Sequence, residues 1–155
     1  MLRVFAVASS LLLAAILSTL VATSAVARAD DNRTEPTLLP ADSKAIAALA
    51  RKAAEADLGK RLTLQIVSMR AARDWAFLFA NMVDRDGKAL DLQGTRFAGA
   101  AAEGQASRAY CALLKRRSEG WTIVASCMAI TDVAWTGWAS KYGAPPEIFD
   151  LKDID

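Results

Sequence analysis

The chain has 155 residues, of which 54% are hydrophobic, and its 19 basic and 17 acidic residues leave a net charge of +2. So small a charge excludes the basic footprint of a nucleic-acid-binding protein. The absence of histidine excludes Ser-His-Asp triads, Cys–His nucleophiles and the common catalytic zinc sites. We expect neither a metal nor a cofactor, and the length suits one domain with a hydrophobic core.

Residues 1–29 have the pattern of a secretory signal peptide. A positively charged start at Met1–Arg3 precedes an apolar run over Val4–Ala22, and two A-x-A cleavage motifs lie between residues 25 and 29. An uncleaved membrane anchor is the alternative, because about 20 apolar residues span a bilayer. We therefore expect a periplasmic or secreted protein, cleaved after Ala27 or Ala29, that has no membrane contact after cleavage.

Removal of the signal peptide also changes the charge. Arg3 and Arg28 are the only charged residues before Asp30, so a chain that begins at Asp30 has 17 basic and 17 acidic residues. Residues 30–41 are polar and contain two prolines, which predicts a flexible leader before a single domain at 42–155.

The first half of the domain predicts a helix followed by strands. The helix is expected over Asp42–Leu58, with Asp42 or Ser43 as its N-cap, Gly59 as its stop, and a core face of Ile46, Leu49, Ala53 and Ala56. Apolar and polar residues alternate over 62–67, which predicts a strand that buries Leu62, Leu64 and Ile66. Residues 70–74 are predicted to form a polar connection. The apolar run 75–83 predicts a buried strand, and the turn residues at 84–87 precede a returning strand at 88–92. Residues 91–105 predict a loop with a short helical turn.

Residues 108–117 and 121–130 predict a β-hairpin closed by a three-residue loop at 118–120. Such a loop pairs Arg117 with Trp121, and counting outward then places Cys111 opposite Cys127. Directly opposed cysteines in an exported protein are expected to form a disulfide. Two buried free thiols are the alternative.

The C-terminal part predicts a short helix over Val133–Tyr142, with Asp132 as its N-cap and Gly143 as its stop. Trp135, Trp138 and Tyr142 recur at helical spacing. They either pin the helix onto the sheet or form a surface for a protein, peptide or glycan ligand. We assign Asp132 and Arg73 to the same candidate binding site.

Carboxylates are the remaining candidates for catalysis. Asp74 and Asp132 are a possible acid–base pair of a small hydrolase, although capping or pairing with arginine accounts for them equally well. Asp84 and Asp86 have the spacing of part of a calcium loop, but the acidic repeat and the terminal glutamate are missing, so a plain turn is expected.

Three stretches, Asp74–Phe77, Trp121–Val124 and Thr131–Trp138 continuing into 141–145, resemble a group of small exported bacterial proteins of uncharacterised function. The resemblance covers residues 61–149 and implies no activity. The order of helix and antiparallel sheet also resembles cystatin-like and nuclear-transport-factor-like folds, which include inhibitors, binding proteins and enzymes.

These patterns predict an α+β domain in which one N-terminal helix packs on a curved antiparallel sheet of four or five strands, followed by a short C-terminal helical turn. The expected function is that of an exported, non-catalytic binding or accessory domain whose ligand the sequence does not identify. A carboxylate-dependent hydrolase and a structural envelope protein are the alternatives.

Overall fold

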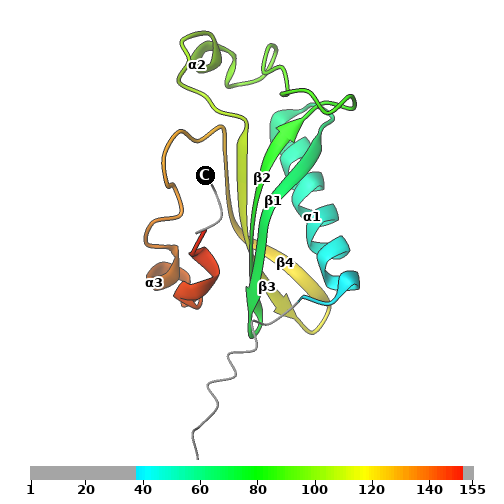
Figure 1. The fold of residues 1–155 in the computed structure, drawn as a ribbon, viewed down its shortest axis with the longest axis vertical. Helices are drawn as coiled ribbons and strands as arrows, with labels where there is room; N and C mark the ends of the chain where they lie inside the picture. The colour runs from blue at the N-terminus through cyan, green and yellow to red at the C-terminus, as the bar shows by residue number, and fades with distance from the viewer. Residues whose placement is uncertain (1–37, 152–155) are drawn as a thin grey trace, which may run out of the picture. The chain divides into compact units, whose positions relative to one another are not determined.

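The computed structural model describes residues 38–151 and has the predicted α+β architecture (Figure 1). One helix, α1, precedes a four-stranded antiparallel sheet with the strand order β1-β2-β3-β4. The elements are α1 (Pro40–Leu58), β1 (Thr63–Ala72), β2 (Trp75–Val83), α2 (Ala98–Ala102), β3 (Ala109–Arg117), β4 (Gly120–Met128), α3 (Trp138–Tyr142) and the 3-10 helix η1 (Pro146–Phe149). The predicted signal peptide lies outside the described residues. Residues 38–151 belong to one compact unit.

One face of the sheet is covered by α1. Its buried residues are spaced four apart, so their side chains form a single stripe along the helix; they are Ile46, Ala50, Ala54 and Leu58. Two of the four are alanines, and so small a side chain lets the helix lie close to the sheet. The predicted burial of Ile46 is confirmed, whereas Ala56 is exposed because it lies off this stripe. No helix within residues 38–151 combines the length and the apolar character needed to cross a membrane.

The first turn of α1 differs from the prediction. The helix begins at Pro40, which suits a first helical position, and Leu39 is the N-cap without a side-chain hydrogen bond. The Asp42 carboxylate instead accepts a hydrogen bond from Trp121 Nε1 at 3.1 Å and pairs with Arg116. The expected N-cap role of Asp42 is therefore wrong, because this side chain has a charged partner on β3.

The second face of the sheet is covered by residues 130–151, which we call the C-terminal segment. Figure 1 shows α1 and this segment on opposite sides of the strands. Phe77 of β2 lies beneath the C-terminal segment. It is fully buried and contacts the rings of Trp135, Trp138 and Phe149. Coverage of both faces explains why β2 and the first part of β3 are nearly continuous apolar runs.

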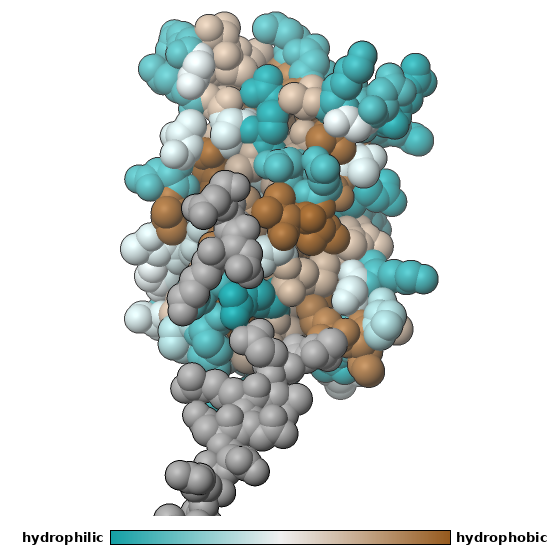
Figure 2. Space-filling model, in the orientation of Figure 1, coloured by the Kyte–Doolittle hydropathy of each residue, from teal (hydrophilic) through white to brown (hydrophobic). Residues whose placement is uncertain are grey.

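The edge strand β1 is longer than predicted and irregular. It continues to Ala72, so the expected polar connection is reduced to the turn at Arg73 and Asp74. A β-bulge at Val67 shifts the register, and Ile66 and Val67 are each 41% exposed. The expected burial of Ile66 is thus wrong, because the bulge turns this part of the edge outward. Figure 2 shows apolar side chains at the surface in the region where Figure 1 draws β1.

The expected strand at 88–92 is also wrong. Only one bridge forms, between Val83 and Ala89. The Asp84 carboxylate accepts backbone hydrogen bonds from Asp86 and Lys88, both at 2.9 Å, which confirms the predicted turn. After the bridge the chain buries two leucines and continues as a loop that contains α2, as predicted.

The β3–β4 hairpin brings the two cysteines together. Arg117 pairs with Gly120, so the loop has two residues rather than three, and the predicted pairing of Arg117 with Trp121 is wrong. A bulge at Val124 restores the expected register further along the hairpin. Cys111 and Cys127 are therefore direct partners, as predicted, with their Cα atoms 5.1 Å apart, and they form a disulfide.

Candidate functional site

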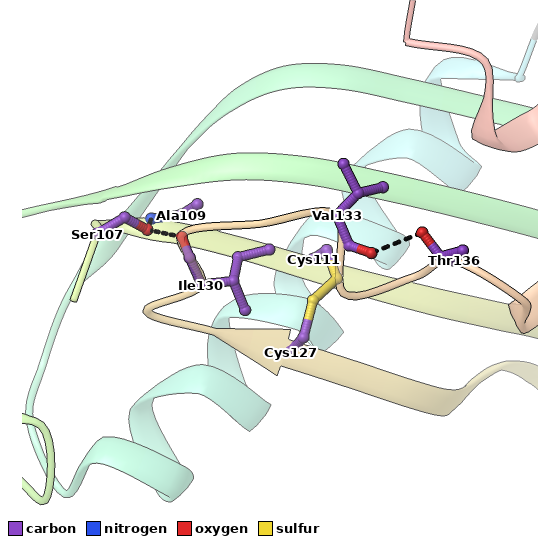
Figure 3. The surroundings of a disulfide bond; sticks show 7 residues. All are labelled: Ser107, Ala109, Cys111, Cys127, Ile130, Val133 and Thr136. Carbon is purple, nitrogen blue, oxygen red and sulfur yellow. Dashed lines mark hydrogen bonds between the residues drawn. A yellow bond between two sulfur atoms is a disulfide. The ribbon is translucent and has the colours of Figure 1, made fainter. Parts of the chain in front are cut away.

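The C-terminal segment starts where the chain leaves β4 and turns over the sheet. Ala129 makes this turn with a φ of 54°, in the left-handed region. Ser107 then holds the segment, because its hydroxyl donates to the Ile130 carbonyl and accepts from the Ala109 amide at 3.0 Å. Figure 3 shows the disulfide beside the loop that carries Ile130, Val133 and Thr136.

The loop before α3 is a series of turns rather than the predicted helix. Thr136 and Trp138 donate backbone hydrogen bonds to Val133 and Trp135, at 3.1 and 2.9 Å. The helix itself is limited to 138–142, because Gly137 precedes it with a φ of 83°. Asp132 is not an N-cap, since its carboxylate accepts only from the adjacent Val133 amide, at 2.6 Å. The stop at residue 143 is confirmed.

The three predicted aromatic residues lie together on the second face of the sheet. Trp135 packs on the rings of Phe77 and Phe79, with centroids 5.4 Å from each. Trp138 forms edge contacts with Phe77 at 6.4 Å and with Tyr142 at 6.1 Å. All three predicted residues are half-buried. Trp135 therefore has a fixed ring that still reaches the surface.

Two exposed amides lie on the same face of the sheet, beyond Phe79. Asn81 is two residues along β2 from Phe79 and so shares its face. Gln65 of β1 is the direct partner of Asn81 and is exposed as well. Neither amide is among the residues predicted to form a site. The only signal was the single polar residue inside the apolar run of 75–83.

The candidate site therefore consists of the Trp135 ring, Phe79 beneath it, and the side chains of Gln65 and Asn81. None of these groups carries a charge. Val133, in the same loop as Trp135, is 50% exposed and adds apolar surface. Aromatic faces combined with groups that both donate and accept hydrogen bonds suit an uncharged polar ligand.

The two predicted polar site residues lie in different places. Asp132 is exposed in the loop that leads to Trp135. Arg73 belongs to the β1–β2 turn, where it is exposed and has a φ of 58°. The structure thus places Asp132 in the loop that carries the aromatic residues, whereas Arg73 lies on a separate element.

Asp74, one of the two carboxylates considered for catalysis, has a structural partner, as does Asp42. Asp74 pairs with Lys115, whose ammonium is 3.5 Å away and lies 4.5 Å above the centre of the Trp75 ring. The indole of Trp121 and the charge of Arg116 hold the pKa of Asp42 below its ordinary value, against an opposing effect of burial. Within residues 38–151, no group of three or more His, Cys, Asp or Glu side chains is arranged to hold a metal.

Comparison of the sequence with models of protein families, with curated proteins and with solved structures gives no match. The resemblance of the tryptophan-containing stretches to small exported proteins stays a prediction. The function is therefore argued from the residues and their geometry.

Proposed function

We propose that this chain is an exported, non-catalytic binding domain for an uncharged, hydroxyl-rich ligand such as an oligosaccharide. The position of Trp135 carries the proposal, because its ring is fixed against Phe79, and Phe79 shares its face of the sheet with the exposed pair Asn81 and Gln65. An indole offers apolar area to one face of a sugar ring, and amides both donate to and accept from hydroxyl groups. Since packing already fixes the indole, little side-chain entropy is lost on binding.

The disulfide is compatible with export, since such bonds persist in oxidising compartments. Its place in the fold also supports the proposed site. Cys111 is the direct partner of Phe79 across β2 and β3, so the bond stiffens the strands that support the Trp135 ring.

The test is a titration with chitohexaose and with cellohexaose of the chain that begins at Asp30. Tryptophan fluorescence reports binding. We expect a saturable change with at least one oligosaccharide, and about a ten-fold weaker affinity in Asn81→Ala, the loss of roughly one hydrogen bond. Trp121→Phe is the matched control, because Trp121 is bound to Asp42 on the α1 side and its loss leaves the site intact.

Absence of any fluorescence change at millimolar concentrations of both sugars, in protein shown to be folded by circular dichroism, would remove the proposal. Equal weakening by Asn81→Ala and Trp121→Phe would also contradict it, because it would indicate a general loss of structure.

A further inference from the structure

Basic residues meet at one end of the sheet, where the β1–β2 turn and the β3–β4 loop are neighbours. The Arg116 amide donates to the Asp74 carbonyl at 2.7 Å. The next residues outward along the two strands, Arg73 and Arg117, therefore lie at this same end. Both are exposed.

Two of the cations at this end are neutralised by acidic partners. Lys115 pairs with Asp74, and Arg116 pairs with Asp42 at the start of α1. The second pair also shows that α1 begins at this end of the sheet, as Figure 1 shows. The two pairs together contribute no net charge.

The remaining charges at this end are mostly positive. Arg73 and Arg117 form no ion pair with any residue from 38 to 151, and Lys44 is exposed near the start of α1. Two exposed acids also lie in this part of the domain: Glu119 in the hairpin loop, and Glu147 of η1, whose neighbour Ile148 packs with Ala72 and Trp75. Since a chain that begins at Asp30 has no net charge, this excess reflects a separation of charge within the domain.

Arg73 is also held in an unfavourable backbone conformation. Its φ of 58° is one that glycine adopts readily and that costs other residues roughly 1–2 kcal/mol. A side chain kept at such a position in an exposed turn points to a role outside the fold. The guanidinium is the group that glycine would lack.

The N-terminal part of the chain is attached at this end as well. Leu39, directly before α1, is 66% exposed and offers an apolar side chain beside the cations.

We propose that this end of the domain docks on the anionic headgroups of a phospholipid bilayer. Charge complementarity supplies the attraction, and each exposed cation near the surface makes a separate contribution. The exposed leucine beside the cations favours a bilayer over a soluble anionic polymer. This end of the domain lies apart from the Trp135 ring of the oligosaccharide site, so a variant at one of them is expected to leave the other intact. Docking on a bilayer differs from the expectation of no membrane contact after cleavage. The sequence alone did not predict that the β1–β2 turn and the β3–β4 loop are neighbours.

The test is sedimentation of the chain that begins at Asp30 with phosphatidylcholine vesicles that contain 40 mol% phosphatidylglycerol, at about 20 mM salt, where surface charges are little screened. We expect binding to these vesicles and none to pure phosphatidylcholine. The variant Arg73→Gln/Arg117→Gln is expected to lower the partition coefficient about 25-fold, at about five-fold for each cation. Glu119→Gln is expected to raise it about five-fold.

The matched control is Arg85→Gln/Lys88→Gln, which removes the same charge from the turn at the other end of β2, where Arg85 is 94% exposed. Its binding is expected to stay within two-fold of the wild type, on the order of experimental scatter. Equal losses in both double variants would overturn the proposal, because net charge alone would then account for binding. Absence of vesicle binding, or equal binding to neutral vesicles, would also overturn it. So would retention on dextran sulfate without vesicle binding. Circular dichroism of each variant confirms that the comparison is between folded proteins.

Discussion

Trp121 donates its indole N–H to the Asp42 carboxylate, 3.1 Å away, and so ties the β3–β4 hairpin to the first turn of α1. Arg116 pairs with the same carboxylate and stacks its guanidinium 4.8 Å from the centre of the Trp121 ring. The helix is thereby fixed to the hairpin through an ionised group. The stability of this junction must depend on pH.

We expect acid to weaken the junction at lower pH than an ordinary aspartate would imply. The Trp121 hydrogen bond, with help from Arg116, lowers the pKa of Asp42 below its ordinary value of 3.8. The carboxylate therefore stabilises the folded state above about pH 4, and this contribution is lost as the pH falls through the folded-state pKa. Urea unfolding between pH 2.5 and 7 measures it.

Asp42→Asn is expected to lower the free energy of unfolding at pH 7 and to flatten its dependence on pH below 4. Asp86→Asn is the matched control, because Asp86 lies in an exposed turn and its closest cation, Arg85, is 3.9 Å away. If both variants lose free energy of unfolding below pH 4 as steeply as the wild type does, the junction contributes nothing to stability in acid.

Reduction of the disulfide is expected to lower the free energy of unfolding by about 3 kcal/mol, because the bond restricts the unfolded chain across a span of this length. Cys111 and Cys127 are 16 residues apart in sequence. Guanidinium unfolding with and without a phosphine reductant measures the difference on an unmutated chain, so no packing is lost through substitution. Coincident unfolding curves, with thiol release confirmed by labelling, would count against a stabilising role.

The cysteine pairing could be predicted from the sequence only because two local errors cancel. The expected loop of three residues is in fact one residue shorter, and the bulge at Val124 adds one residue to β4. Beyond that bulge the register is the predicted one, so Cys111 still faces Cys127. Bulges respond to strand twist and to packing between layers, and neither is encoded in the alternation of one strand.

The C-terminal segment shows the opposite case. The spacing of Trp135, Trp138 and Tyr142 correctly indicated contact with the sheet, whereas the helix expected around them is limited by Gly137. The exposed amides of the candidate site, Gln65 and Asn81, become neighbours only through the register of β1 and β2. A pairing between two strands is a long-range property that no single segment reveals.

Tyr110→Phe is expected to stabilise the protein by about 1 kcal/mol at pH 8. Tyr110 is fully buried beneath α1, and its hydroxyl has no hydrogen-bond partner with good geometry among residues 38–151. An unsatisfied buried hydroxyl costs about that much. Thermal unfolding measures the change. Tyr142→Phe, in the half-buried aromatic cluster, is the control and should not be stabilising.

The same tyrosine predicts a loss of stability in alkali. Burial raises the pKa of Tyr110 from 10.0 to about 12. The negative charge of Asp57 also raises this pKa, whereas the hydroxyl of Ser126 lowers it. Between these values the unfolded phenol loses its proton and the folded one keeps it, so stability falls as the pH rises from 10 to 12. Tyr110→Phe should reduce this decline, and an unchanged alkaline limb would show that other groups cause it.

Phe77→Ala is expected to loosen the C-terminal segment selectively. Its ring is the common contact of Trp135, Trp138 and Phe149, and truncation of such a buried ring costs about 3–5 kcal/mol. Hydrogen exchange across residues 130–151 should increase under native conditions. Leu78→Ala, a buried residue that faces α1, is the control for general destabilisation. Equal exchange in the two variants would show that the layers open together.

Arg73→Gly separates the fold from the proposed role of this residue. Because φ at Arg73 is 58°, glycine should relieve backbone strain, and we expect stability to rise by about 0.5–1 kcal/mol. Vesicle binding should fall about five-fold at the same time, since one cation is lost. Arg85→Gly is the control, because Arg85 is not among the described non-glycine residues with a positive φ, and it should not be stabilising. A less stable Arg73→Gly variant would mean that the arginine side chain supports the turn, and the strain at this position would then no longer point to a ligand.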